Sequence, residues 1–142
     1  MGKVMERVRL SNIGEHLDAL AGKIPADAVH TVDVDGLVDT GATCLVIPAD
    51  LVERLGLRSE GTRQVRYADG RRAPVPLVGG IRLEILGRWM TCDALVHPVG
   101  TPVLIGQIPL EGLDLVVDPK NRELRPNPES PDAPLMDVMS AA

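Results

Sequence analysis

Short apolar runs separated by frequent turn residues most constrain what this chain can fold into. Charged and apolar side chains alternate over residues 4–11, and similar two-residue periods recur further along the sequence. This alternation is typical of half-buried strands. The sequence contains one Trp, one Tyr and no Phe, so its core must consist of Val, Leu and Ile, and Val and Ile favour strands. We therefore predict an all-β domain, closed or sandwich-like.

One short helix is predicted at residues 48–56, where Leu51 and Leu55 share a face and Gly56 occupies a C-terminal cap position. Residues 12–22 fit either a short helix or an ordered excursion, and residues 110–113 fit one helical turn. Gly36 is interpreted as a turn and Trp89 as a core residue. Strands are expected at residues 4–11, 28–35, 44–47, 64–67, 73–78, 81–86, 89–96, 102–105, 115–117 and 122–124.

The composition changes near the C-terminus. Residues 127–142 are rich in Pro, Ser, Asp and Ala, a composition that predicts a disordered tail. We therefore place one domain at residues 1–126, and its size is sufficient for a hydrophobic core.

The net charge limits the classes of partner. The formal charge is −5, whereas a nucleic-acid or anionic-membrane partner usually requires a basic face. Neither partner is expected. The basic side chains Arg63, Arg66, Arg71 and Arg72 are interpreted as the solvated residues of a charged hairpin rather than as a binding patch.

Cysteine usage and the absence of targeting patterns predict a cytoplasmic protein. Residues 1–16 carry charges throughout and contain no apolar signal core, and no apolar run could span a bilayer. Cys44 and Cys92 lack CxxC partners and are interpreted as small buried thiols in a reducing compartment. The three histidines are scattered, so no metal or other cofactor is expected.

The chemically informative segment is Asp39-Thr40-Gly41-Ala42-Thr43, which follows the apolar pair Leu37-Val38. Small residues after Asp39 let the backbone turn sharply and leave little bulk around the carboxylate. The Thr40 hydroxyl could fix the loop, and backbone amides of the small residues could hold a carboxylate or a substrate carbonyl. A turn-capping aspartate would give a similar pattern.

Taken in order, four segments resemble retropepsin-like (retroviral-type) aspartic proteases. Residues 38–43 resemble the active-site loop, and Ile47-Pro48 with residues 51–57 resembles the stretch that follows it in bacterial members. Residues 67–71 resemble the flap hairpin. Residues 103–106 followed by Leu110 resemble the hydrophobic-hydrophobic-Gly motif, whose strand supports the active-site loop.

The resemblance covers residues 4–126 and implies a closed acid-protease β-barrel that acts as a homodimer. It also implies the residues of the site. Catalytic roles fall on Asp39, Thr40 and Gly41, and substrate contacts fall on Ala42, Thr43, Tyr67, Ala68, Asp69, Gly70 and Arg71.

Two positions depart from the retroviral pattern. Thr43 stands where those enzymes usually carry Asp, and Gln107 stands where they carry Arg. In the retroviral enzymes, that Asp and that Arg form an ion pair near the dimer interface. Both ends of that pair are replaced here, so no charge is left unpaired, and the interface must be held differently.

The family mechanism implies a second copy of the chain. It needs two carboxylates around one water, one to activate the water and one, protonated, to polarise the peptide carbonyl. Carboxylates about 3 Å apart share a proton and titrate as a unit, whereas an isolated aspartate is ionised near neutrality. Asp-Thr-Gly occurs once in the sequence. The predicted partners are therefore a symmetry-related copy and a peptide or protein substrate.

Several alternatives stay open. The chain could be a relative that dimerises or binds peptides with weak or no turnover, or a protease that processes only its own tail or one partner. Asp33-Val34-Asp35-Gly36 is similar to the start of a phosphohydrolase loop. That chemistry requires a doubly wound α/β domain, and the predicted helix content is too low for one.

Overall fold

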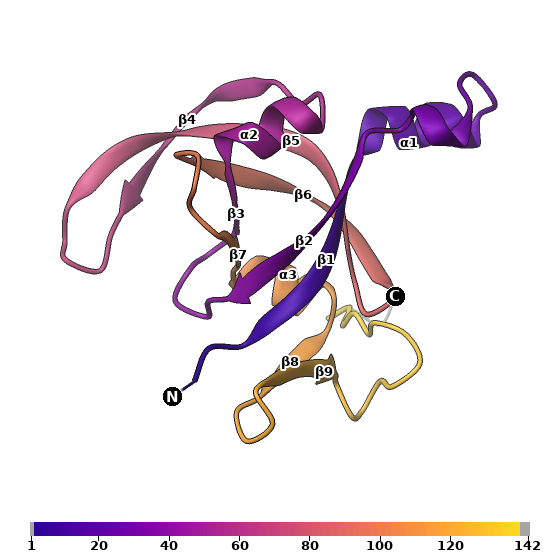
Figure 1. Cartoon of the computed structure of the whole chain (residues 1–142). Coiled ribbons are helices and arrows are strands. Elements are labelled where there is room, and N and C mark those ends of the chain that lie inside the picture. The colour runs from indigo at the N-terminus through magenta and orange to yellow at the C-terminus, as the bar shows by residue number, and fades with distance from the viewer. Residues whose placement is uncertain (1, 140–142) are drawn as a thin grey trace.

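The computed structural model describes residues 2–139, and most of its regular structure is β-strand (Figure 1). One sheet has the strand order β1-β2-β7-β3-β6-β5-β4, and an additional β1–β5 pairing closes six of these strands into a barrel. This confirms the all-β prediction and decides for a barrel over a sandwich. The strands are β1 Met5–Asn12, β2 Thr31–Val38, β3 Leu45–Pro48, β4 Ser59–Arg66, β5 Arg72–Ile85, β6 Arg88–His97, β7 Val103–Ile105, β8 Leu115–Asp118 and β9 Glu123–Pro126.

The prediction of a single short helix was wrong, because the described residues contain three short α-helices and one 3-10 turn, η1 (Ala26–Ala28). The expected helix is α2 (Ala49–Arg54). A second helix, α1 (Ile13–Leu20), begins where the Asn12 side chain accepts a hydrogen bond from the backbone of Glu15 at 3.1 Å. The third, α3 (Gln107–Gly112), starts earlier than the predicted turn at 110–113. No helix among these residues has the length and apolar character needed to cross a membrane.

Two single-residue predictions were also wrong. Gly36 lies inside β2, opposite Val103 of β7, and a Cβ at this position would lie 2.9 Å from Cδ1 of Ile105. Gly36 therefore permits close packing rather than a turn. Trp89 is 58% exposed, and the Arg82 guanidinium carbon lies 5.0 Å from its ring centroid. This cation–π contact lies on the outer surface, away from the core.

Aliphatic side chains fill the barrel, as the absence of Phe requires. The largest fully buried side chains come from most of its strands and from the end of α2. They interlock as one core cluster, which includes Leu10, Leu45, Ile47, Leu55, Ile81, Leu83, Ile85, Ile105 and Leu113.

The outer face of the β1–β2 pair is charged. Arg9 binds Asp33 at 2.8 Å, and Arg7 binds Asp35 at 3.3 Å. Both aspartates of the phosphohydrolase-like segment therefore lie in cross-strand ion pairs. The sheet is also not a doubly wound parallel one, so that alternative is excluded.

The ends of β2 and β7 position the loop that follows Val38. These strands run parallel, with Val38 beside Ile105, and Asp39 N–H donates to the Ile105 carbonyl at 3.0 Å. The amides of Gln107 and Ile108, at the start of α3, donate to the carbonyls of residues 42 and 43, each at 2.8 Å. The loop at residues 39–44 is thus fastened by backbone hydrogen bonds to the β7–α3 junction.

Gly106 lies between these hydrogen bonds and is buried. A Cβ at this position would lie 2.6 Å from the Ala42 carbonyl oxygen and 2.9 Å from the Cys44 nitrogen. These are backbone atoms, which cannot rotate away. Only glycine allows the loop to approach this closely.

The segment after β9 has no helix or strand among its described residues, but its first part is hydrogen-bonded to the barrel. Asp114 accepts hydrogen bonds from Asn127 Nδ2 at 3.1 Å, Leu135 N–H at 3.0 Å and the Ser130 hydroxyl. Buried Arg88 donates to the carbonyls of Asp114 and Ser130. The proposed domain boundary after residue 126 stays a prediction.

We predict that Gly106→Ala destabilises the fold by about 1–3 kcal/mol, because the new methyl group displaces fixed backbone. Gly14→Ala is the matched control, since its site in α1 has only a side-chain oxygen at 3.4 Å. The control should be neutral or stabilise by up to about 1 kcal/mol. Urea unfolding measures both free energies, and equal effects of the two changes would contradict the packing argument.

We predict that Asp114 makes stability depend on pH. The Ser130 hydroxyl, the Leu135 amide and the Asn127 side chain lower the pKa of the Asp114 carboxyl below its usual value. A lowered pKa stabilises the folded state above the unfolded-state pKa, and the effect is lost as pH falls through the folded-state pKa. Asp114→Asn should therefore be less stable than the parent at pH 7, with the difference beginning to shrink below about pH 4 and vanishing only below the lowered folded-state pKa.

Thermal unfolding at a series of pH values checks this prediction. Asp132→Asn is the control, because it removes an exposed carboxylate from the same segment. A difference in stability between the parent and the Asp114→Asn protein that does not change with pH would contradict the assignment.

Candidate active site

Asp39 lies directly after β2, in the loop fastened to the β7–α3 junction. Its side chain is half-buried, and Oδ1 accepts the backbone N–H of Gly41 at 3.0 Å. Its carbonyl accepts the Ala42 N–H at 3.1 Å. The tight turn therefore uses the small residues as the sequence predicted. The structure records no hydrogen-bond partner for Oδ2 among residues 2–139, so this oxygen can face a water molecule.

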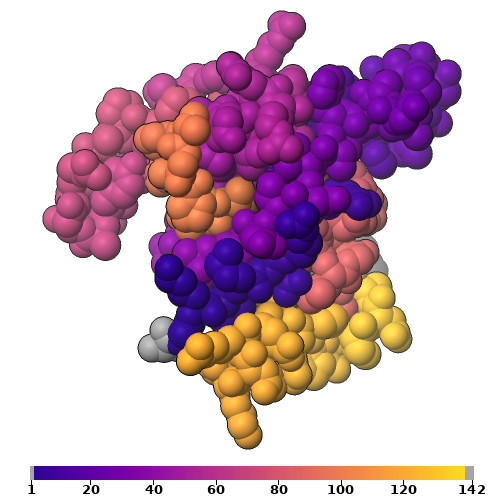
Figure 2. All heavy atoms as spheres, in the orientation of Figure 1, coloured from indigo at the N-terminus to yellow at the C-terminus, as the bar shows by residue number. Residues whose placement is uncertain are grey.

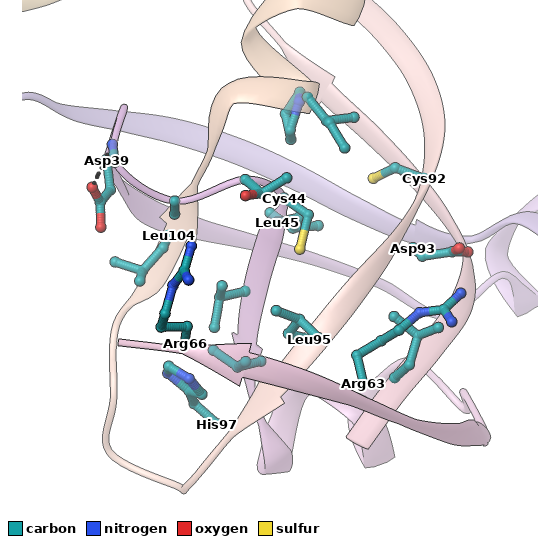
Figure 3. Close-up of a pocket in the computed structure, with 18 of the residues that line it drawn as sticks. Asp39, Cys44, Leu45, Arg63, Arg66, Cys92, Asp93, Leu95, His97 and Leu104 are labelled. Carbon is teal, nitrogen blue, oxygen red and sulfur yellow. Dashed lines mark hydrogen bonds between the residues drawn. The ribbon is translucent and has the colours of Figure 1, made fainter. Parts of the chain in front are cut away.

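The Asp39 carboxylate lines a cleft with a volume of about 1010 Å³. Its walls come from the loop at residues 39–44, from β6 and from the β4–β5 hairpin. The end of this hairpin, residues 62–76, stands away from the barrel and is called the arm (Figure 2). Figure 3 shows Asp39 at one end of the cleft and Asp93 on the opposite side. This volume lies at the upper end of the range for ligand pockets.

The tip of the arm is a tight turn around Asp69 and Gly70. Tyr67 N–H donates to the Arg71 carbonyl at 2.8 Å, and the Asp69 carboxylate accepts the Arg71 N–H at 2.9 Å. Gly70 has a φ of +85°, which glycine adopts without strain. This confirms the predicted Asp-Gly hairpin, both in its position and in the residues that form its turn.

Tyr67 connects this arm to the end of β6. Its hydroxyl lies 3.5 Å from Nε2 of His97, and the Arg71 guanidinium carbon lies 4.6 Å from its ring centroid. The ring is thus held between a cation and an imidazole beside the cleft. Tyr67 therefore packs against its neighbours and also lines the cleft.

The structure brings most of the predicted site residues together, although their roles stay predictions. The cleft lining includes Asp39, Gly41, Ala42, Thr43, Tyr67 and Ala68. Thr40 is exposed and lines a second, smaller hollow with residues 37–39. The remaining three predicted residues, Asp69, Gly70 and Arg71, form the tip of the arm and do not line the cleft.

Several lining residues were not predicted from the sequence. On the arm, Arg63 and Arg66 face the cleft, so the interpretation of these two as merely solvated hairpin residues was incomplete. Leu95 and His97 of β6 and Leu104 of β7 also line it. Strand alternation next to the Asp-Gly turn is the only sequence signal for these residues. It does not indicate which face of the arm lies toward the loop at residues 39–44.

Both cysteines line the cleft, but neither is suited to act as a nucleophile. Burial raises the pKa of the Cys92 thiol to about 12 and also raises the pKa of Cys44. Both thiols are therefore protonated near neutrality, whereas a thiolate is the reactive species. A Cys–His hydrolase using His97 of the same cleft is therefore disfavoured. The prediction that both cysteines are buried is confirmed only in part, because both side chains are of intermediate exposure.

Residues 2–139 contain no group of three or more His, Cys, Asp or Glu side chains placed to hold a metal ion. A half-buried aspartate with one oxygen held by the backbone, at the edge of a large cleft, is suited to activating water.

Comparison with known families agrees with this geometry. The sequence model of a family described as aspartyl protease matches residues 24–109. The matched span contains the active-site loop, the hairpin arm and the β7–α3 junction. None of the curated proteins compared with the chain matched it significantly. Because the family match covers more than half of the sequence and the barrel is closed as the family requires, the chain belongs to the aspartyl proteases of the retropepsin-like type.

Proposed function

We propose that the protein is an endopeptidase that hydrolyses peptide bonds as a homodimer, with one Asp39 from each copy on either side of a single water. Family membership supports an aspartic protease in general terms. The observation that carries the finer proposal is the half-buried Asp39 carboxylate at the edge of the cleft, in a loop whose next two residues are exposed. The sequence contains no second Asp-Thr-Gly to complete a pair within one chain.

The surface around the loop supports a second copy as the missing half. Thr40, Gly41 and Thr43 are exposed, which gives the loop a hydroxyl-bearing, sterically small outer face. Ile108 is 48% exposed and adjoins the loop through its hydrogen bond to residue 43. An apolar side chain beside exposed hydroxyls is suited to a small symmetric interface. A two-fold axis here would bring two Asp39 side chains together.

In the proposed reaction the two carboxylates hold one proton between them. The ionised one removes a proton from water as the water oxygen attacks the peptide carbonyl carbon. The protonated one donates to the carbonyl oxygen, so that a neutral tetrahedral diol forms. The C–N bond then breaks as one carboxyl group donates its proton to the departing amine and a diol hydroxyl gives a proton to the other carboxylate. The products are a new carboxylic acid and a new amine, and the pair again holds one proton.

The arm is proposed to hold the substrate over the loop. Tyr67 and Ala68 line the cleft from the arm, and Leu95 and Leu104 line it from the barrel. A peptide lying between these walls would contact apolar side chains and the exposed backbone of the arm. Ordering by the arm would place its carbonyl near the carboxylate pair.

Asp39→Asn should reduce peptide cleavage by at least about a thousandfold, because an amide cannot take the proton from water. Cleavage of a mixed peptide library, followed by mass spectrometry, measures this loss. Asp35→Asn is the matched control, since Asp35 also precedes a glycine but pairs with Arg7 on the outer face. Full activity of the Asp39→Asn protein would refute the assignment. Pepstatin or peptide binding without cleavage by the parent would favour the non-enzymatic alternative.

Specific activity should fall on dilution, because each site needs two chains. Thr40→Val should raise the dimer dissociation constant about tenfold, since a symmetric interface loses the hydroxyl hydrogen bond twice. Sedimentation velocity over a concentration series measures the constant. Thr62→Val, an exposed change on the arm that does not line the cleft, is the control. A strictly monomeric parent, or an unchanged constant for the Thr40→Val protein, would count against this interface.

A further inference from the structure

We infer that the cleft selects peptides with an acidic side chain close to the scissile bond, and that Arg66 recognises this side chain. The inference rests on the proposed peptidase function and adds a substrate class to it. Arg66 lies at the end of β4, next to Tyr67, and lines the cleft. Figure 3 shows its side chain extending from the arm into the cleft, on the side of Asp39 and Leu104.

The second arginine of the arm is in a different electrostatic setting. Arg63 lies at the opposite end of the cleft, on the side of Asp93 (Figure 3). Two carboxylates converge there on Gly79, because Asp93 Oδ1 lies 3.1 Å from the position a Gly79 Cβ would take and Glu60 lies closer still. These acids make that end of the cleft less attractive to a substrate carboxylate.

No ion pair is recorded for Arg66 among residues 2–139, and the acid on its side of the cleft is Asp39 itself. The ion pairs recorded for this part of the chain involve other cations. Its direct cross-strand neighbour is another cation, Arg72, and like charges in that position repel. The neighbouring Arg71 is stacked on the tyrosine ring. An anion bound at Arg66 would relieve this repulsion, in a chain whose overall charge is −5.

The chemistry of the guanidinium group favours a carboxylate as the anion. Its planar fork of N–H donors matches the two oxygens of a Glu or Asp side chain, and such bonds are stronger than neutral ones. The proposed Asp39 pair holds one proton, so it contributes one negative charge against two copies of Arg66 in the dimer. An acidic residue under the arm is thus attracted to Arg66, whereas a lysine at the same position is repelled.

The experiment separates binding from cleavage. In the Asp39→Asn background, fluorescence anisotropy measures the affinity of labelled peptides in which one Glu, Gln or Lys is moved along an apolar sequence. At one position, the Glu peptide should bind about fivefold more tightly than the Gln peptide, the upper range for an exposed ion pair. Arg66→Gln should reduce this ratio to about one, and Arg66→Glu should make the Lys peptide the preferred one.

Arg58→Gln is the matched control, because it removes an exposed arginine just before β4 that does not line the cleft. It should keep the fivefold ratio. A ratio that stays intact in the Arg66→Gln protein, or that is lost only on Arg63→Gln, would overturn the assignment. So would equal binding of the Glu and Gln peptides by the Asp39→Asn protein with Arg66 in place.

Cleavage of the same peptides by the parent protein distinguishes a failure of this inference from a failure of the proposed function. An Arg66-dependent binding preference without any cleavage would support the inference and refute the proposed function. Cleavage with equal kcat/KM for Glu and Gln peptides at every position would support the function and refute the inference. Raising the salt concentration should narrow the Glu-to-Gln ratio, because exposed ion pairs are screened.

Discussion

The close backbone approach between the Asp39 loop and the β7–α3 junction is the constraint on which the rest of the site depends. β2 and β7 lie side by side and parallel, so the two chains leave the barrel at the same edge. Gly106 lets them touch, since any Cβ there would overlap backbone atoms of residues 42 and 44. Backbone hydrogen bonds then hold the loop at three points. A carboxylate positioned in this way is fixed before any substrate arrives, which would reduce the cost of organising the proposed reaction.

The barrel explains why this loop has an open face. Closure through β1 and β5 uses six strands, and the remaining strand of the sheet, β4, extends beyond the barrel with the end of β5 as an arm. The arm forms one wall of the cleft, and its attachment through Tyr67 and His97 keeps it close to β6. The outer face of the loop stays exposed. A single copy therefore contains a substrate wall and one carboxylate, and the chemistry of the family calls for a second carboxylate facing the first.

The charges within the cleft are unevenly distributed. The thiols of Cys44 and Cys92 are held in the neutral form by burial, and the acids Glu60 and Asp93 gather at the end near Gly79. Arg66, on the side of Asp39, makes no recorded ion pair among residues 2–139. Because a cleft partly excludes water, such a charge acts more strongly on a bound ligand than it would on an open surface. Under the proposed function, substrate preference would therefore arise from the arm, while the loop would perform the chemistry.

The sequence by itself determined the features that depend on neighbouring residues: the strands with two-residue alternation, the Asp-Gly hairpin, the helix at residues 49–54 and the sharp turn after Asp39. Tertiary structure decided the features that depend on contacts between distant residues. Gly36 is a packing residue because Ile105 lies against it, and Trp89 is exposed because its face of the β5–β6 pair points outward. The direction of the Arg66 side chain was likewise not predictable. Alternation assigns a side chain to one of the two faces of a strand, but it does not show which part of the protein that face contacts. That depends on the twist of the arm over the barrel, which only the assembled strands define.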